Sequence, residues 1–588
     1  MPTSDLPGRS DLEKLAKERF HRLGVSEINL LLAAAKGEIA YCGPNKQDDD
    51  PNNDPTQSDR WEPERDIRAE LLRWLCLDRD AISCVDRRGI QAHAAKITGS
   101  LDLSYVSVPF FLRFVYCCFS EDVNLHFIEI PAIDFTRSLL PCLYASYASV
   151  KGSMRLQGLQ ANGVVRLYGA HIDGNLECNG GKFRNAWKAD AEESGTALHG
   201  EGAKVGGHIF LSQGFLAEGE VRLYGAEIGG NLECDRGEFQ NPPQNGLQGS
   251  GIALNAERAK VGGGVYLRNE FVSEGEVRFL GAEIGGNLEC DGGKFQNPPQ
   301  NGPQGSGIAL NAEHAKVTGS AYFRNEFSAK GKVRLYQTQI GRNLESTSAG
   351  LESLELTNAS ATKILDKKAS WPQKGKLSLD GFTYSRISGD EKKIGERLDW
   401  LARHEPFSRH PYRQLAKVLR ETGDDQGACR VGAEMERRAW AERGWPFRPA
   451  SYLLRATVGY GYFSLRALWW LLGLFALGSV VYSQGYIAGS MVPTDKEAYR
   501  SLVVDNQVPG YYQTFHATAY SLENSFPLLK LGVQDKWAPG PAVQGMSRSR
   551  NWWTSPRLLL WFKWGQICVG WLLATLFVGG VTGIIRKE

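Results

Sequence analysis

The sequence predicts an all-β parallel β-solenoid, followed by an α-helical hairpin and two transmembrane α-helices. Three observations predict this fold class. The middle of the chain repeats itself every 56 residues, with short alternating apolar stretches between glycine turns. A basic helical segment follows the repeats, and two uncharged apolar runs of 22 residues lie beyond it. We therefore expect a long soluble body that is attached to a small membrane module.

Composition excludes several classes of protein. The chain has 588 residues, of which 42% are hydrophobic, which argues against wholesale disorder. Its mean hydropathy of −0.33 argues against a polytopic membrane bundle. Lys+Arg 68 against Asp+Glu 66 leaves a net charge of +2, so we expect no nucleic-acid partner. Eleven cysteines without a Cys-x-x-Cys pair favour free thiols in a reducing compartment.

The N-terminal part is expected to be helical. No apolar segment of a cleavable signal peptide occurs at the start, and residues 1–42 predict a helical segment with a helix over 11–35. Residues 43–60 are rich in Asn, Asp, Pro and Gln and predict a disordered linker. Residues 61–93 predict a capping helix, whose apolar side chains recur at helical spacing: Ile67, Leu71, Leu72 and Leu75.

The 56-residue repeat predicts the solenoid over residues 94–390. The segment Val165-Arg166-Leu167-Tyr168-Gly169-Ala170 recurs at 221–226 and, with changes, at 277–282 and 333–336. Within each period a β-branched residue before glycine recurs at spacings of 33 and 23. Coils of about 22 residues are typical of a β-solenoid, here with ten to twelve coils and a length of about 50 Å at ~4.8 Å per rung. The longer spacing predicts a surface insertion such as 240–246.

Two sets of polar or reactive residues occupy equivalent repeat positions. Cys178, Cys234 and Cys290 would lie two rungs apart, about 10 Å, which is too far for a disulfide. We therefore interpret them as small buried hydrophobic residues rather than as a metal or redox site. The repeated asparagines are expected to satisfy backbone groups of turns: Asn175, Asn231, Asn287 and Asn343.

Residues 391–445 predict a helical hairpin connector, with helices over 411–420 and 426–443. Residues 446–588 predict a two-span membrane module. The runs 467–488 and 564–585 are each long enough to cross ~30 Å of hydrocarbon, and tryptophans gather near their ends. Charges flanking the spans are nearly balanced. Because a long body without a signal peptide precedes the first span, we expect cytoplasmic termini, an outer loop over 489–557 and a bacterial inner (plasma) membrane location.

The outer loop contains the segment 514–532, in which a helix-length apolar stretch of about ten residues is stopped by Pro527. A helix, a breaker and a glycine between two spans resemble the pore loop of two-span ion channels, and the candidate pore residues are His516, Glu523 and Lys530. No Thr-Val-Gly-Tyr-Gly filter is present, and an amphipathic helix on the outer leaflet is the alternative. Gly579 and Gly583 form a Gly-x-x-x-Gly pair that favours helix packing and self-association.

Several segments resemble a bacterial family that is common in actinobacteria and ends in two transmembrane helices. The resemblance covers residues 61–588 and rests on Gly-Ala-x-Ile-Gly-Gly-Asn-Leu repeats, on segments 369–372 and 379–384, on the hairpin segment 411–420, and on 458–462 and 570–575. Members are usually called uncharacterised membrane proteins, and some carry the label "membrane-associated oxidoreductase". The resemblance carries no catalytic residue over to this sequence.

Motifs for chemistry are not found in this sequence. Gly292-Gly293-Lys294-Phe295 lacks the Ser or Thr of a P-loop, and no dinucleotide fingerprint, metal-spaced histidine pair or nucleophile elbow occurs. We therefore expect no catalytic, cofactor or metal site, and whether the protein is an enzyme stays open. The expected function is a binding or scaffold module tethered to the lipid bilayer, with an unknown cytoplasmic protein or ligand as partner. The alternatives are an oligomeric two-span channel gated by the solenoid and a membrane-associated oxidoreductase.

Overall fold

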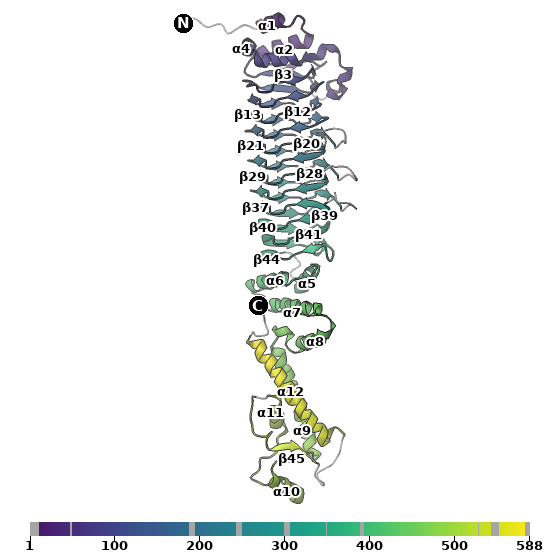
Figure 1. Cartoon of the computed structure of the whole chain (residues 1–588), viewed down its shortest axis with the longest axis vertical. Coiled ribbons are helices and arrows are strands. Elements are labelled where there is room, and N and C mark those ends of the chain that lie inside the picture. Colours follow the sequence, from purple (N-terminus) through teal and green to yellow (C-terminus); the bar gives the residue numbers. More distant parts are fainter. Residues whose placement is uncertain are drawn as a thin grey trace, which may run out of the picture. The chain divides into compact units, whose positions relative to one another are not determined.

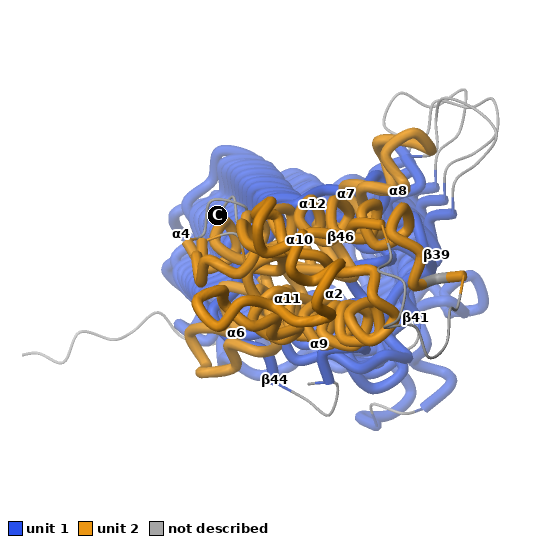
Figure 2. The backbone as a smooth tube through the Cα atoms, turned by 90° about the horizontal axis from the view of Figure 1, so that it is seen from below, with its two compact units in different colours: residues 1–414 blue, residues 415–588 orange. Residues whose placement is uncertain are grey.

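The computed structural model describes residues 11–47, 50–186, 195–242, 250–298, 306–348, 350–388, 393–526, 528–541 and 552–582. The chain divides into two compact units, residues 1–414 and 415–588, which Figure 2 colours separately. Unit 1 contains the long parallel sheets, and unit 2 contains the two long apolar helices.

Unit 1 is a parallel β-solenoid, as the repeat predicts. Each coil contributes four short strands, and each strand pairs with its equivalents in the coils before and after it. Ser149 pairs with His171, His171 with Lys204, and Lys204 with Glu227, so the spacings of 22, 33 and 23 residues each correspond to one coil. Figure 1 shows these strands stacked one above another along the unit.

The strands form four parallel ladders. The first ladder contains β9 (Glu129–Ile130), β13 (Ser149–Val150), β17 (His171–Ile172), β21 (Lys204–Val205), β25 (Glu227–Ile228), β29 (Lys260–Val261), β33 (Glu283–Ile284), β37 (Lys316–Val317), β40 (Gln339–Ser346), β42 (Ser360–Asp366) and β44 (Thr383–Ser388). The second contains β1 (Ala40–Tyr41), β3 (Ile90–His93), β6 (Leu112–Val115), β10 (Ile133–Asp134), β14 (Met154–Arg155), β18 (Leu176–Glu177), β22 (Ile209–Phe210), β26 (Leu232–Glu233), β30 (Val265–Tyr266), β34 (Leu288–Glu289) and β38 (Ala321–Phe323), and it also ends in β40.

The other two ladders make up the second sheet. The third contains β2 (Asp66–Arg68), β4 (Lys96–Thr98), β7 (Cys118–Phe119), β11 (Leu139–Leu140), β15 (Gln160–Ala161), β19 (Lys182–Arg184), β23 (Leu216–Glu218), β27 (Glu238–Gln240), β31 (Val272–Glu274), β35 (Lys294–Gln296) and β39 (Ser328–Arg334). The fourth contains β5 (Leu101–Asp102), β8 (Val123–Asn124), β12 (Leu143–Tyr144), β16 (Val165–Arg166), β20 (Thr196–His199), β24 (Glu220–Arg222), β28 (Ile252–Asn255), β32 (Glu276–Arg278), β36 (Ile308–Asn311), the last residues of β39, β41 (Gly350–Glu355) and β43 (Leu377–Ser378).

Alternation along each strand fills the interior of the solenoid with apolar side chains. One interior column consists of phenylalanines whose ring centroids lie 5.2–5.5 Å apart from coil to coil: Phe183, Phe215, Phe239, Phe271, Phe295 and Phe327. Each fully buried ring contributes about 1.5–3 kcal/mol relative to exposure. At one corner the backbones of successive coils lie so close together that a Cβ on Gly229 would lie 2.2 Å from the carbonyl oxygen of Gly206. The glycine repeat is therefore a steric requirement of the stack.

The N-terminal cap differs from the sequence expectation in three places. Residues 11–35 form two helices, α1 (Asp11–Arg19) and α2 (Val25–Lys36), rather than one. The capping helix begins only at α3 (Ala69–Leu77) and is followed by α4 (Arg79–Cys84), because β2 pairs Ile67 with Ile97 as part of the solenoid interior. The solenoid thus begins before residue 94, with β1, β2 and β3.

The expectation of a disordered linker over 43–60 is also corrected. The segment contains 3-10 turns at Pro51–Asn53 and Pro55–Arg60, and a third follows at Pro63–Arg65. Asp50 and Asp54 accept hydrogen bonds from the backbone N–H groups of Asn52 and Thr56. Asn53 is fully buried, and its amide donates to the carbonyl oxygen of Gln47. Local polar bonds therefore order a segment that lacks apolar side chains.

The last coil is closed by helices α5 (Ile394–Leu401) and α6 (His410–Glu421). Arg397 of α5 is buried and pairs with Asp366 at the end of β42, with a shortest nitrogen–oxygen distance of 2.6 Å. Trp371 also donates its indole N–H to Asp366 at 2.8 Å. A buried charge with this many partners fixes α5 against the solenoid end.

Unit 2 begins within α6 and continues with α7 (Asp425–Glu442), so the predicted helical hairpin is present. Next come α8 (Arg448–Thr457), α9 (Leu465–Ile487), α10 (Lys496–Asp505), α11 (Ala517–Ser525) and α12 (Pro556–Val581), with 3-10 turns at Trp445–Phe447, Gly459–Gly461 and Trp552–Thr554. β45 (Met491–Pro493) and β46 (Trp537–Pro539) form a small antiparallel pair within the segment that connects α9 to α12.

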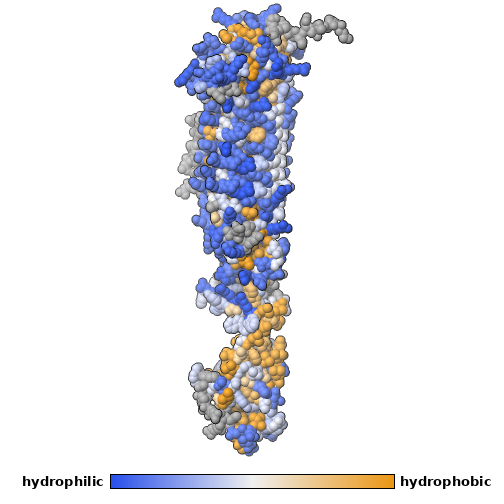
Figure 3. Space-filling model, turned by 180° about the vertical axis from the view of Figure 1, so that it is seen from behind, coloured by the Kyte–Doolittle hydropathy of each residue, from blue (hydrophilic) through white to orange (hydrophobic). Residues whose placement is uncertain are grey.

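Two helices of the described chain, α9 and α12, are long and apolar enough to cross a membrane. Only 22% of the most apolar window of each helix is buried, whereas a core helix of a soluble protein would be mostly buried. Hydrophobic residues gather over this part of unit 2 in Figure 3, while the visible solenoid surface is mainly hydrophilic. α12 begins at Pro556, earlier than the predicted 564, and so includes Arg557 and Lys563.

Candidate functional site

Three insertions leave the solenoid from equivalent positions, between β19 and β20, β27 and β28, and β35 and β36. At the start of each insertion an asparagine side chain donates 2.8 Å hydrogen bonds across its base: Asn185 to Thr196, Asn241 to Ile252 and Asn297 to Ile308, in each case to the carbonyl oxygen. Equivalent bases lie two rungs apart, about 10 Å. The inserted residues 187–194, 243–249 and 299–305 lie outside the described residues, as does part of the predicted insertion 240–246.

Two of the bases contain a buried carboxylate. Glu276 is 2% exposed, and its oxygens accept hydrogen bonds from Arg278, Asn311 and Ser306 at 3.0–3.1 Å. Glu220 repeats this arrangement one period earlier, with Arg222, Asn255 and Ser250. Because Ser306 and Ser250 are the first described residues after their insertions, each carboxylate binds the returning chain. The cluster holds the base of an insertion on the solenoid.

A glycine makes this close approach possible. Gly275 has φ +125°, and a Cβ there would lie 2.7 Å from the carbonyl oxygen of Asn241. The recurring Gly-Glu-Val-Arg at 219–222 and 275–278, together with the Asn and Ser around each insertion, is the sequence signal for this anchor. Sequence reasoning identified the insertions but missed these anchoring residues.

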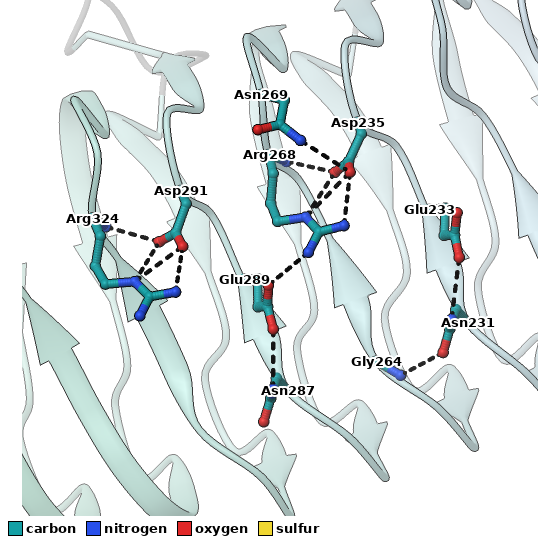
Figure 4. A network of polar contacts seen from close by, with 10 residues as sticks. All are labelled: Asn231, Glu233, Asp235, Gly264, Arg268, Asn269, Asn287, Glu289, Asp291 and Arg324. Atoms are coloured by element: carbon teal, nitrogen blue, oxygen red, sulfur yellow. Dashed lines mark hydrogen bonds and ion pairs between the residues drawn. The ribbon is translucent and has the colours of Figure 1, made fainter.

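A second repeated network lies at the ends of the second-ladder strands (Figure 4). Arg268 pairs with Asp235 of the previous coil and Glu289 of the next, both at 2.8 Å, and Arg324 pairs with Asp291 at 2.6 Å. Asn231 accepts a hydrogen bond from the backbone N–H of Gly264 at 3.0 Å, which confirms the expected role for this asparagine, while the role of Asn343 stays a prediction. Asn175 and Asn287 make the equivalent bond to the next coil. These groups satisfy one another and stabilise the stack.

The repeated cysteines are structural. Cys178, Cys234 and Cys290 are fully buried, and Leu211 and Leu267 occupy the same position in the intervening coils. Burial raises the pKa of all three thiols well above its usual value, which favours the neutral thiol at neutral pH. All eleven cysteines are free thiols. In the described part of the chain no group of three or more His, Cys, Asp or Glu side chains could hold a metal ion.

In unit 2, helix α11 enters the space between the two span helices. Just before α11, Phe515 stacks on Tyr486 near the end of α9, with ring centroids 4.9 Å apart. Further along α11, Ser521 donates a 2.8 Å hydrogen bond to the carbonyl oxygen of Phe475, in the middle of α9. At a rise of about 1.5 Å per residue, these two contacts differ in depth by about 16 Å. The segment from Phe515 to Ser521 therefore packs along α9 from near its end to its middle.

Gln566 of α12 joins all three helices. Its side chain is 2% exposed and accepts a 2.8 Å hydrogen bond from the hydroxyl of Tyr482 on α9. Its amide nitrogen donates to the hydroxyl oxygens of Ser521 and Ser525 on α11, at 3.0 and 2.8 Å. A buried side-chain amide needs internal hydrogen-bond partners, and here they belong to α9 and α11. Sequence reasoning missed Gln566, although it is the one amide inside the second predicted span.

The three candidate pore residues have different environments. Glu523 is buried, and its carboxylate accepts four consecutive backbone N–H groups, those of residues 531–534, at 2.8–3.2 Å. It therefore holds the chain that returns from α11. His516 is exposed at the start of α11 and lies 3.1 Å from the Thr514 hydroxyl, and Lys530 is exposed on the returning segment. Pro527 lies outside the described residues.

Two other glycines of α12 lie in close contact with neighbouring segments, and the prediction for Gly579 and Gly583 stays a prediction. Gly579 is only partly buried, and Gly583 lies outside the described residues. The neighbouring Gly580 is buried, and a Cβ there would lie 2.3 Å from the hydroxyl oxygen of Ser464. A Cβ on Gly570 would lie 2.6 Å from the carbonyl oxygen of Ser525. These glycines admit the neighbouring chain within one protein molecule, as small residues do in membrane bundles.

A groove with a mixed polar and apolar lining runs between α9 and the start of α11, with a volume of about 450 Å³. Its polar lining is Ser479, Ser483, Gln484, His516 and Thr518. Polar side chains in a span usually face a partner or a water-filled space rather than lipid. The groove is therefore the surface of the membrane module at which a further contact is expected.

Comparison of the chain with family models, with curated proteins and with solved structures found no match. The function is therefore argued from the geometry.

Proposed function

We propose that this protein is a membrane-anchored binding module, in which the solenoid presents its aligned insertions to a soluble partner. The observation that carries the proposal is the repeated anchor at the insertion bases, formed by Asn185, Asn241 and Asn297 with the carboxylates of Glu220 and Glu276. A solenoid needs no such insertion to fold, and insertions that recur on one edge of a repeat protein form its binding face in many cases.

The membrane module supplies the attachment in this proposal. Helices α9 and α12 cross the bilayer, with the solenoid in the cytoplasm and the loop 489–557 outside. The resemblance of residues 61–588 to a bacterial family with two C-terminal spans supports an inner-membrane location. The partner would be a cytoplasmic protein or ligand that spans at least two insertions, about 10 Å apart.

Site-specific photocrosslinking of the full chain tests the proposal. A benzophenone amino acid is placed at Pro242 or Pro298, which are exposed and equivalent residues at the insertion bases. The matched control position is Glu283, an exposed residue on the first ladder. We expect the same crosslinked species from both proline positions after irradiation of intact cells, and none from the control.

Two outcomes oppose the proposal. Crosslinks of equal yield from Glu283 and Pro242 would mean that no face of the solenoid is preferred. Different species from Pro242 and Pro298 would mean that the insertions do not act together, contrary to the repeated geometry.

A second candidate function is an oligomeric channel, favoured by the packing of α11 along α9 and by the groove beside it. Helix α11 reaches mid-span, and Ser483, Gln484 and His516 supply polar atoms along the groove. In this alternative several copies bring their grooves together around one pathway, because two spans cannot enclose a pore alone.

Ion flux into proteoliposomes tests the channel candidate. A channel predicts flux in the wild type that Gln484→Leu reduces, since this change removes a polar group from the groove. The exposed Gln507, which lies outside the spans, provides the matched control Gln507→Leu. A wild type without flux rejects this candidate and leaves the anchored binding module.

A further inference from the structure

A basic pocket lies between α7 and α8, where the chain approaches the first span. Its volume is about 190 Å³, and it is lined by Arg437, Trp440, Ala441, Arg448, Ser451, Tyr452, Arg455 and Tyr460. Three of the lining residues are arginines, and no acidic residue is among those that the structure describes. The pocket contains none of the predicted pore-loop residues or packing glycines, and the proposed binding function does not involve it.

The spacing along α8 puts its polar groups on one side of the helix. Arg448, Ser451 and Arg455 follow one another at intervals of three and four residues, so they share one face. Arg448 is the first residue of the helix and directly follows the 3-10 turn Trp445–Phe447. The described residues form no ion pair with Arg448 or Arg455, and both side chains are exposed.

An unusual backbone conformation completes the pocket. Tyr460 has φ +58° and is 5% exposed, and bulky residues rarely adopt this conformation. Its hydroxyl lies 2.8 Å from that of Ser451, so two hydroxyl groups meet at the wall of the pocket. Strain of this kind persists where the surroundings require one placement of a side chain.

The charge of the pocket is positive. Arg437 is paired with Glu434 on α7, with nitrogen–oxygen distances of 2.6 and 2.5 Å, and Arg438 contacts the same carboxylate. The two arginines of α8 therefore supply the uncompensated charge of the lining. Guanidinium groups and hydroxyls together match the oxygens of a phosphate group.

The surroundings of the pocket are those of a membrane interface. Trp445, Phe447 and Tyr452 are 78%, 47% and 68% exposed, and α9 begins at Leu465, eight residues after α8 ends. Aromatic side chains of this kind lie at the headgroup level of a bilayer. Basic pockets beside spans on the cytoplasmic side bind acidic lipid headgroups.

We infer that this pocket binds the phosphate of an anionic phospholipid headgroup. Arg448 and Arg455 bind the phosphate oxygens, and the bonded pair of hydroxyl groups on Ser451 and Tyr460 donates one hydrogen bond to the phosphate. The acyl chains follow the exposed apolar side chains of α9. The inference rests on the spans crossing a bilayer and is independent of what the solenoid binds.

Native mass spectrometry of the full-length protein in detergent tests this inference. Dioleoyl phosphatidylglycerol is the anionic probe, and dioleoyl phosphatidylcholine is the zwitterionic probe with the same chains. The variant R448Q/R455Q removes the two α8 charges. Because each basic residue at an anionic surface contributes about a factor of five in affinity, we expect phosphatidylglycerol binding to fall about thirtyfold, with phosphatidylcholine binding unchanged.

The matched control is R430Q/R500Q, which loses the same charge at two exposed positions away from the pocket. We expect it to bind phosphatidylglycerol like the wild type, and the thermal transition of each variant verifies folding. Equal losses in both double variants would overturn the inference, because binding would then follow net charge alone. Displacement of phosphatidylglycerol by millimolar inorganic phosphate would also overturn it and would assign the pocket to a soluble phosphate compound.

Discussion

Replacement of Gln566 by leucine is the perturbation that tests the packing of α11 most directly. Leucine has a similar size, so the change removes hydrogen bonds without opening a large cavity. Three bonds of 2.8–3.0 Å are lost, one to Tyr482 on α9 and one each to Ser521 and Ser525 on α11. Hydrogen bonds between helices in membranes contribute about 0.6 kcal/mol each on average, so the free energy of unfolding should fall by about 2 kcal/mol.

Reversible unfolding in mixed micelles, followed by tryptophan fluorescence, measures this loss. Gln484→Leu is the matched control, since Gln484 lies in the other span and is exposed in the groove. We expect the control to change the free energy of unfolding by less than about 0.5 kcal/mol. A double-mutant cycle with Ser525→Ala should show coupling with Gln566, because the two side chains contact each other.

The reasoning is refuted if Gln566→Leu destabilises no more than Gln484→Leu. That outcome would mean that α11 does not pack against the centre of α12, and that the polar groups of α11 have other partners or water.

Three further predictions concern packing and protonation. Gly570→Ala should destabilise the module by about 1–3 kcal/mol in the same unfolding assay, because the added methyl group would meet the carbonyl oxygen of Ser525. The control Gly565→Ala should be neutral, since no atom lies within 4 Å of a Cβ placed there. Burial lowers the pKa of His404 in the folded solenoid, so the unfolded chain takes up the proton at a higher pH. The solenoid should therefore be fully stable above about pH 6.5 and lose stability below it. A melting temperature that does not fall below this pH, or that falls equally in His404→Gln, would contradict the role of His404. Cys234→Ser should lower the free energy of unfolding of the solenoid by about 1–3 kcal/mol, because it buries an unpaired hydroxyl. Cys234→Ala should be less destabilising than Cys234→Ser. A larger loss of stability in Cys234→Ala would indicate a polar environment at this position.

The solenoid could be predicted because its physical requirement is local and repeats. A coil must return to the same place, so Gly229 and Asn231 recur at fixed spacing and the interior apolar residues alternate. The roles of Cys234 and Asn231 followed from this periodicity alone. The two spans were predicted for a similar reason, since length and apolarity are properties of one continuous segment.

The remaining features depend on contacts between distant residues. The segment 43–60 has a disordered composition, yet Asn53 and the Asp50 cap order it through polar bonds that no apolar pattern reveals. Glu523 has the sequence position of a pore residue, but its partners are backbone N–H groups of residues 531–534, which composition cannot indicate. The close contact of Gly580 is with Ser464, more than a hundred residues earlier in the chain, so the sequence of α12 alone does not indicate it.

The central claim is that the membrane module anchors a solenoid that binds a soluble partner. Native mass spectrometry of the protein, extracted with its surrounding lipid from the membranes in which it is made, tests this claim most directly. The account predicts one or two copies of the chain together with an additional non-lipid mass, and this mass should be lost when Asn241 and Asn297 at the insertion bases are replaced by alanine. A closed ring of three or more copies without any further component would contradict the account and would favour the channel.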